Sequence, residues 1–105
     1  QLLEYPPFTV LARFLLSDFD EQEAQRMATL LGDFLAEHYP QIERLGPSAA
    51  PIEKIRERYR YHLVLKHHDL NLLLEAANRG QIYMNVSRKS KTLRIVIDVE
   101  PQSIL

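Results

Sequence analysis

Two groups of basic residues are the features of this sequence best suited to chemistry with an anionic partner. The first group is Arg58, Arg60 and Lys66, and the second is Arg88, Lys89, Lys91 and Arg94. Clustered Lys and Arg side chains bind phosphates and release the counterions condensed on a nucleic acid. These seven residues are therefore predicted to bind nucleic acid, although four charges before a strand are also typical of a solvated loop.

The other chemistry-bearing residues favour structural roles. His67 and His68 are adjacent and so point to opposite faces of a strand, while Asp69 suits a helix N-cap, so no metal site is predicted. The sequence has no HExxH motif, no Ser-His-Asp spacing and no glycine-rich phosphate loop, so an enzyme is not predicted. The enzyme alternative, a small ferredoxin-like hydrolase, would need such a loop where Ser17–Asp20 supply acidic residues.

The composition predicts one globular domain over residues 1–105, cut from something longer. The chain has 105 residues, 46% of them hydrophobic, and its first residue is Gln. The absence of cysteine excludes disulfides, thiolate metal ligands and thiol nucleophiles. Because the apolar runs are far shorter than the ~20 residues that span a bilayer, no membrane partner is expected.

The formal net charge of −1 conceals an asymmetry along the chain. Residues 1–52 carry three basic and eight acidic side chains, whereas residues 53–105 carry ten basic and six acidic ones. Electrostatic fields act locally, because salt screens them within about 8–10 Å. The near-zero net charge therefore does not exclude a polyanionic partner for the basic half.

Apolar periodicity predicts the elements that would position these side chains. Alternation predicts a strand over Phe8–Leu16, followed by a loop at Asp18–Asp20. Apolar residues then recur at helical spacing over Ala24–His38, which predicts an amphipathic helix of about five turns that Pro40 ends.

The rest of the chain supplies three more strands and a second helix. The predicted elements are a short strand Gln41–Leu45, a loop or hairpin connection Ser48–Glu57, a strand Arg58–His67, a helix Leu70–Arg79 followed by Gly80, further helical turns or a basic loop within Gln81–Ser90, and a last strand Leu93–Val99. This order predicts an α+β fold, a ferredoxin-like or ribosomal-protein-like sandwich with two main helices on one face of a mixed or antiparallel sheet.

Strand alternation also predicts a mixed surface on the helix-free face of the sheet. The basic residues of strand Arg58–His67 fall on that face, and its tyrosines and leucines fall on the other. A docking face is predicted there from Leu11, Arg13, Leu15, Val64 and Val96. A wholly solvated face would not usually keep four aliphatic side chains, although single exposed aliphatics are common.

Four segments in order resemble the C-terminal domain of PriA, the primosomal replication-restart DNA helicase (primosomal protein N′). Tyr5-Pro6-Pro7-Phe8 is similar to the family's YPPF entry into the first strand, and Leu45-Gly46-Pro47 is similar to its LGP turn. The run from Arg58 to Lys66 resembles its RYRxxLLLK strand, and Asp98-Val99-Glu100-Pro101 resembles its terminal DVDP. Together the segments span nearly the whole chain.

The resemblance implies a domain of a bacterial ATP-dependent helicase that engages branched DNA. It implies forked or single-stranded DNA, the rest of the helicase and the single-stranded DNA-binding protein SSB as partners, and a cytoplasmic, nucleoid-associated location. It implies no cofactor in this chain, because ATP, Mg and Zn would belong to upstream domains. Carried over by position, the RYR match makes Arg58 and Arg60 the leading DNA contacts, and Lys66 matches the final basic residue of the strand.

Three hypotheses follow from these observations. The first is a DNA-binding and docking module of a replication-restart helicase. The second is a purely protein-docking module that contacts the helicase core or SSB. The third is an unrelated RNA-binding domain of ribosomal type. Contacts to SSB are not assigned to residues, because the helix that would carry them begins with leucines after Asp69 where some relatives offer basic and amide groups.

Overall fold

The computed structural model describes residues 8–103, without the side chains of residues 8, 51–55 and 101–103. The Tyr5-Pro6-Pro7 segment lies outside this range. Six elements follow one another along the chain: β1 (Phe8–Asp18), α1 (Glu21–His38), β2 (Glu43–Ile55), β3 (Arg58–His67), α2 (Leu70–Ser87) and β4 (Arg94–Ser103).

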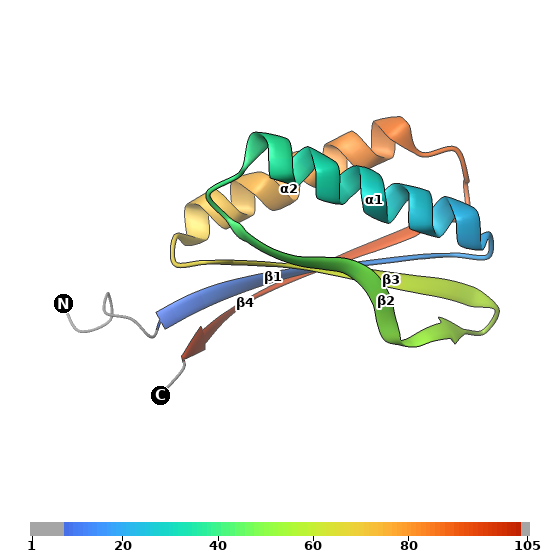
Figure 1. Cartoon of the computed structure of the whole chain (residues 1–105), viewed down its shortest axis with the longest axis horizontal. Helices are drawn as coiled ribbons and strands as arrows, with labels where there is room; N and C mark the ends of the chain where they lie inside the picture. The colour runs from blue at the N-terminus through green and yellow to red at the C-terminus, as the bar shows by residue number, and fades with distance from the viewer. Residues whose placement is uncertain (1–7, 104–105) are drawn as a thin grey trace.

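The four strands form one antiparallel sheet in the order β2-β3-β1-β4. Figure 1 shows both helices lying on one face of this sheet. The element order and the strand order together give the ferredoxin-like arrangement. The predicted fold class, two helices packed on one face of an antiparallel sheet, is confirmed.

Helix α1 forms where the sequence predicts it. Its N-cap is Asp20, whose carboxylate accepts a hydrogen bond of 3.0 Å from the backbone N–H of Gln22. The buried side of the helix presents Met27, Leu31 and Leu35 to the sheet, and the helix ends at His38, before Pro40. The sequence prediction is therefore confirmed apart from an earlier start at Glu21.

Strand β2 is much longer than predicted. It runs from Glu43 to Ile55, so the expected loop at Ser48–Glu57 is wrong except for the turn itself. The turn residues Arg56 and Glu57 both have positive φ, as in a tight two-residue hairpin. Proline usually interrupts a strand, but β2 is an edge strand with two register shifts, and an edge tolerates prolines.

Helix α2 and strand β4 also extend beyond their predicted ends. The sequence predicts that Gly80 follows the helix, but α2 continues through it to Ser87. A Cβ atom built at Gly80 would lie 3.0 Å from Leu31 Cδ1 and 3.6 Å from Phe14 Cζ, so this glycine permits close packing rather than ending the helix. The backbone of β4 continues to Ser103, because an edge strand can accommodate Pro101.

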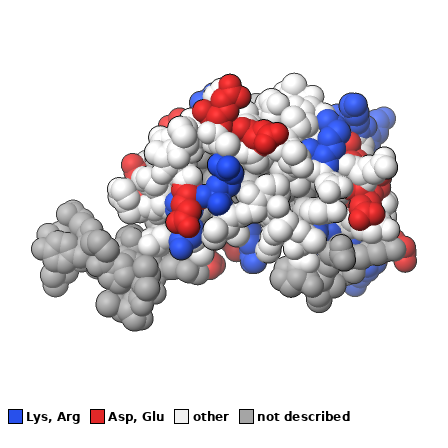
Figure 2. Space-filling model, in the orientation of Figure 1, with Lys and Arg blue, Asp and Glu red and all other residues white. Residues whose placement is uncertain are grey.

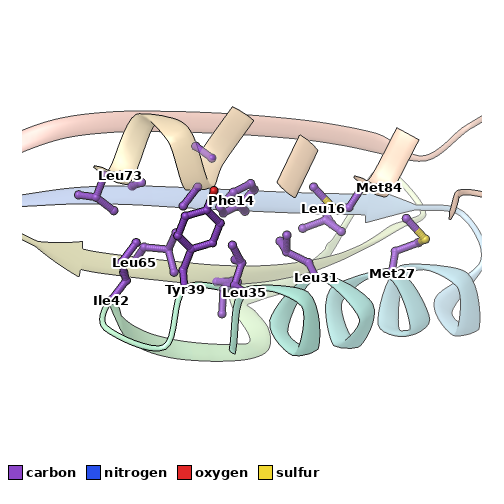
Figure 3. Close-up of a cluster of buried hydrophobic side chains, with 14 of the residues drawn as sticks. Phe14, Leu16, Met27, Leu31, Leu35, Tyr39, Ile42, Leu65, Leu73 and Met84 are labelled. Atoms are coloured by element: carbon purple, nitrogen blue, oxygen red, sulfur yellow. The ribbon is translucent and has the colours of Figure 1, made fainter. Parts of the chain in front are cut away.

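The hydrophobic core lies between the helices and the sheet (Figure 3). Phe14 and Leu16 of β1 are fully buried against Met27, Leu31 and Leu35 of α1. Strand β3 and helix α2 contribute their own apolar faces to the same core. The core thus covers one face of the central strands β1 and β3, and no helix packs on their opposite face.

The close approach at Gly80 gives a stability prediction. Gly80→Leu is expected to lower the free energy of unfolding by about 1–3 kcal/mol, because the new side chain must displace Leu31 and Phe14. The matched control is Gln81→Leu at the exposed neighbouring position, which should change it by less than about 0.5 kcal/mol. Urea unfolding measures both. Equal stability of the two variants would contradict the packing role of Gly80.

Candidate nucleic-acid interface

The structure brings parts of the two predicted basic groups to the same end of the sheet. Ser17, near the end of β1, pairs with Arg60 of β3 on one side and with Arg94 of β4 on the other. Strand β4 is preceded by the loop between α2 and β4, which carries Lys89 and Lys91. Figure 2 shows Lys and Arg atoms gathered at the end of the molecule where this loop lies.

We call this surface the basic end and define it by four side chains. They are Arg60, Lys89, Lys91 and Arg94. Arg60 is half-buried, and Lys89, Lys91 and Arg94 are exposed. The register therefore places Arg60 and Arg94 on either side of Ser17, with the loop that carries Lys89 and Lys91 leading into β4, an arrangement that the separation of these residues in the sequence does not reveal.

Arg58, the leading predicted DNA contact, is not an exposed residue. It is only 9% exposed, because its guanidinium crosses β1 and is enclosed there. Its Nε and one terminal nitrogen donate to Ser17 Oγ and Ser17 O, each at 3.1 Å, and the same nitrogen donates to the carbonyl of Thr92. The expectation of Arg58 on an open basic row is wrong, because its hydrogen bonds hold β3, β1 and the loop before β4 together.

Arg88 also serves the loop rather than the surface. Its guanidinium donates to Asn85 Oδ1 at 3.3 Å, to the carbonyl of Ser90 at 3.1 Å and to the carbonyl of Leu93. These bonds close the chain between the end of α2 and the start of β4. Arg88 is half-buried, and we therefore place it in the scaffold of the basic end rather than among its four cations.

A buried glutamate, Glu23 of α1, fixes the same loop from the helix side. Its Oε2 accepts hydrogen bonds from the backbone N–H groups of Lys89 and Ser90, at 2.8 and 3.2 Å. Its carboxylate also forms an ion pair with Arg26, whose Nε lies 2.9 Å from Oε1. The bond from Arg26 and the two backbone bonds lower the pKa of Glu23 to about 2, against the opposing effect of burial.

Two residues important for this end do not stand out in the sequence. Glu23 is buried on α1, and the sequence alone does not show that its carboxylate reaches the loop between α2 and β4. Phe19 is 52% exposed in the turn between β1 and α1, and the guanidinium carbon of Arg58 lies 4.6 Å from the centre of its ring. Nothing in the sequence predicts that pairing, because it depends on the register of β1 and β3.

Lys66 is separated from the other predicted contacts. It lies in the last part of β3, six residues from Arg60, which corresponds to about 20 Å along an extended strand. Its register partners are Leu11 on β1 and Glu43 on β2, and Leu11 pairs in turn with Glu100 on β4. Lys66 therefore lies among acidic neighbours in the sheet and does not extend the basic end.

The helix-free face contains the predicted docking residues. Leu15 pairs with Val96, and Arg13 pairs with Val64 and with Asp98. Two hollows of about 310 Å³ each lie on this face, and the five predicted residues Leu11, Arg13, Leu15, Val64 and Val96 each line at least one of them. Figure 1 shows β2 bending toward this side, and Ala50 of β2 lines the first hollow.

The expectation that the adjacent histidines at the end of β3 point to opposite faces is wrong, because the chain leaves the strand after His67 and the two rings come together. The rings of His67 and His68 stack with their centres 4.4 Å apart, and His67 Nδ1 accepts a hydrogen bond from the backbone of Asp69. Asp69 is the N-cap of α2, as predicted. Among residues 8–103, no three His, Asp or Glu side chains are grouped to hold a metal ion, and no helix is long and apolar enough to cross a membrane.

Comparison with known proteins gives matches over nearly the whole chain. A family model described as the primosomal protein N C-terminal domain matches residues 1–102. Replication restart protein PriA of Borreliella burgdorferi is 30% identical over 107 residues, which cover 98% of this chain and 15% of that protein. PriA of Bacillus subtilis is 30% identical over 102 residues, which cover 96% of this chain and 13% of that protein. The chain thus spans about one seventh of the length of these relatives.

Solved structures with a similar fold have unrelated sequences. A de novo designed protein, Foldit4, superposes with a TM-score of 0.70 at 11% identity, covering 88% of this chain and 96% of the design. A hydantoinase/carbamoylase family amidase from Burkholderia ambifaria gives a TM-score of 0.60 at 13% identity, covering 89% of this chain and 28% of the amidase. These likenesses show the fold alone.

The lowered pKa of Glu23 predicts acid sensitivity. A carboxyl group whose folded pKa lies below its unfolded value stabilises the fold above the unfolded value, and this contribution is lost as pH falls from about 4.5 toward 2. Glu23→Gln should therefore be less stable than the wild type at neutral pH, by at most about 3 kcal/mol, and the difference should shrink below pH 4.5.

The matched control for this measurement is Glu37→Gln, which removes an exposed carboxylate from the same helix. Urea unfolding across the acid range should show no comparable pH-dependent loss for this control. A Glu23→Gln variant as stable as the wild type at neutral pH would show that the carboxylate does not hold the loop.

Proposed function

Because this chain belongs to the family of primosomal protein N C-terminal domains, we propose that it is the DNA-binding and docking module of a bacterial replication-restart helicase. The chain carries no catalytic motif of its own, and its relatives are about seven times longer. ATP-dependent helicase activity, with its ATP, Mg and Zn, would therefore belong to other parts of such a protein. The third hypothesis, an unrelated RNA-binding domain of ribosomal type, is wrong because the family match covers the chain.

The observation that carries the proposal is the convergence of cations at the basic end. Arg60 and Arg94 flank Ser17 in the sheet, and Lys89 and Lys91 lie on the loop that leads into β4. The backbone of that loop is fixed by Glu23, so little ordering is needed when its lysines contact phosphates. A forked or single-stranded DNA would then approach this end of the sheet, and its phosphates would displace counterions.

A separate observation supports docking on the helix-free face. The two hollows around Arg13 are lined by aliphatic side chains, such as Leu15 and Val64, and by the polar or charged side chains of neighbouring residues, which include Arg60 in the first hollow. Val96 on this face is 48% exposed although it is apolar. An apolar surface rimmed by charges is typical of a protein contact. We propose that the rest of the helicase covers this face, with SSB as a further partner whose contact residues are not assigned, in a cytoplasmic, nucleoid-associated protein.

The DNA-binding proposal predicts a change in salt dependence. Replacing Lys89, Lys91 and Arg94 by Ala in this chain should weaken binding to a forked oligonucleotide. Each lost phosphate contact should reduce the slope of log K against log salt by about 0.7–0.9. Fluorescence anisotropy over a range of salt concentrations measures the affinity and the slope together.

The matched control is Lys66→Ala, which removes one cation from the opposite end of β3. This variant should keep the wild-type slope and nearly the wild-type affinity. An unchanged slope in the triple variant, or an equal loss per residue for Lys66, would contradict the proposed interface.

The docking proposal predicts an effect of charge on the helix-free face. Val96→Asp should weaken association of this chain with the upstream region of its own reading frame by about tenfold or more, because the interface would bury an unpaired carboxylate. Ile82→Asp introduces the same charge on α2, where the side chain is 55% exposed, and should have little effect. Isothermal titration calorimetry distinguishes them. Equal behaviour of the two variants would contradict docking through the sheet.

A further inference from the structure

Phe19 is an exposed aromatic ring at the basic end. It lies in the short turn between β1 and α1 and is 52% exposed. Large apolar side chains are also exposed on β2, on α2 and on β4, but among the described residues Phe19 is the one in the turn beside the loop between α2 and β4. An aromatic side chain left exposed beside cations calls for an explanation other than core packing.

One face of the Phe19 ring is covered by a cation. The guanidinium carbon of Arg58 lies 4.6 Å from the ring centre, which is a cation–π contact. Arg58 is itself held by Ser17 and by the carbonyl of Thr92, so the group behind the ring is fixed. The accessible part of the ring therefore includes the face opposite Arg58.

The residues on either side of Phe19 are also fixed. Asp18 is fully buried and accepts a hydrogen bond from Thr92 Oγ1, and Asp20 caps α1 through the backbone N–H of Gln22. The ring consequently loses little freedom when another flat group stacks on it, which favours binding.

The charges around Phe19 favour a phosphate-bearing partner on one side. Arg60 and Arg94 are the register partners of Ser17, two residues before the ring. The sequence Ser17–Asp20 contains two aspartates, which would repel phosphate. Asp18 is buried, however, so Asp20 is the one aspartate of this segment that lies at the surface. The exposed carboxylates Asp20 and Glu21 lie on the α1 side. Phosphates would thus pass on the β4 side of the ring.

We propose that Phe19 is a stacking platform for one unpaired base of a nucleic-acid strand whose phosphates bind the basic end. This inference rests on the proposed function and deepens it, since it names an unpaired nucleotide as the group recognised there. Stacking on an aromatic ring is tolerant of sequence because every base has a flat π face. Arg58 would contribute by holding the ring in place, without touching DNA itself.

The first test uses a fluorescent ring at the same position. The chain contains no tryptophan, so Phe19→Trp introduces a single reporter. An oligothymidylate of about 12 nucleotides should quench its fluorescence on binding, because the indole stacks on a base. Ile82→Trp is the matched control at a similarly exposed position on α2, and it should not be quenched. Quenching of both variants, or of neither at saturating oligonucleotide, would overturn the stacking platform.

The second test separates the base from the phosphates. The wild-type chain should bind an oligonucleotide of about 12 nucleotides roughly tenfold more tightly than an abasic strand with the same number of phosphates. Phe19→Ala should remove most of this preference while leaving the salt slope unchanged, since stacking releases no counterions. Phe19→Leu, which keeps an apolar side chain without a ring, should behave like Phe19→Ala.

The outcomes distinguish this inference from the proposed function. If Lys91→Ala lowers the salt slope but the Phe19 variants keep the full preference for bases, the platform is wrong and the DNA-binding proposal stands. If the chain binds no oligonucleotide at any salt concentration, both are wrong. If the upstream region of the protein changes the fluorescence of the Phe19→Trp variant and DNA does not, Phe19 is a protein contact and the inference is overturned.

Discussion

The hydrogen bonds of the buried Arg58 guanidinium to Ser17 and Thr92 are the interaction on which the basic end depends. A buried charge is stable only where hydrogen bonds satisfy it, and Arg58 finds its acceptors on β1 and on the loop before β4. Glu23 acts in the same way from α1, by accepting two backbone N–H groups of that loop. These two charges make one rigid unit from segments that lie far apart in the sequence, and the surface cations project from it.

Much of the fold was predictable because it follows from local periodicity. Alternation in β1 and β3 and the helical spacing of α1 each report one buried face, and together they define the sandwich. The errors fall where tertiary context outweighs a local signal. Gly80 is typical of a residue that follows a helix. In the structure it lies within α2, where the absence of a side chain lets Leu31 pack close to the helix backbone. Prolines look like the end of β2, but that strand lies at an edge.

The sequence indicates which residues share a face of the sheet, but it does not indicate how the basic residues are arranged. Strand alternation correctly placed Arg13, Val64 and Val96 on the helix-free face. Alternation could not show that Arg58 would be buried. Its burial depends on contacts with Ser17, Thr92 and Phe19, which lie far from Arg58 in the sequence and come together only in the folded chain. The family resemblance likewise aligns Arg58 with a basic motif, but the geometry gives that arginine a supporting role beneath the surface.

The central claim is that DNA binds at the end of the sheet where β1 finishes and β4 begins. Backbone amide NMR spectra of this chain, recorded during titration with a forked oligonucleotide, test it most directly. The largest shifts are expected at Phe19, at Arg60 and within residues 88–94. Residues at the opposite end, such as Lys66 and Glu100, should stay nearly unchanged. Shifts centred on Lys66 and Glu100, or spread evenly over the outer face of α2, would contradict it.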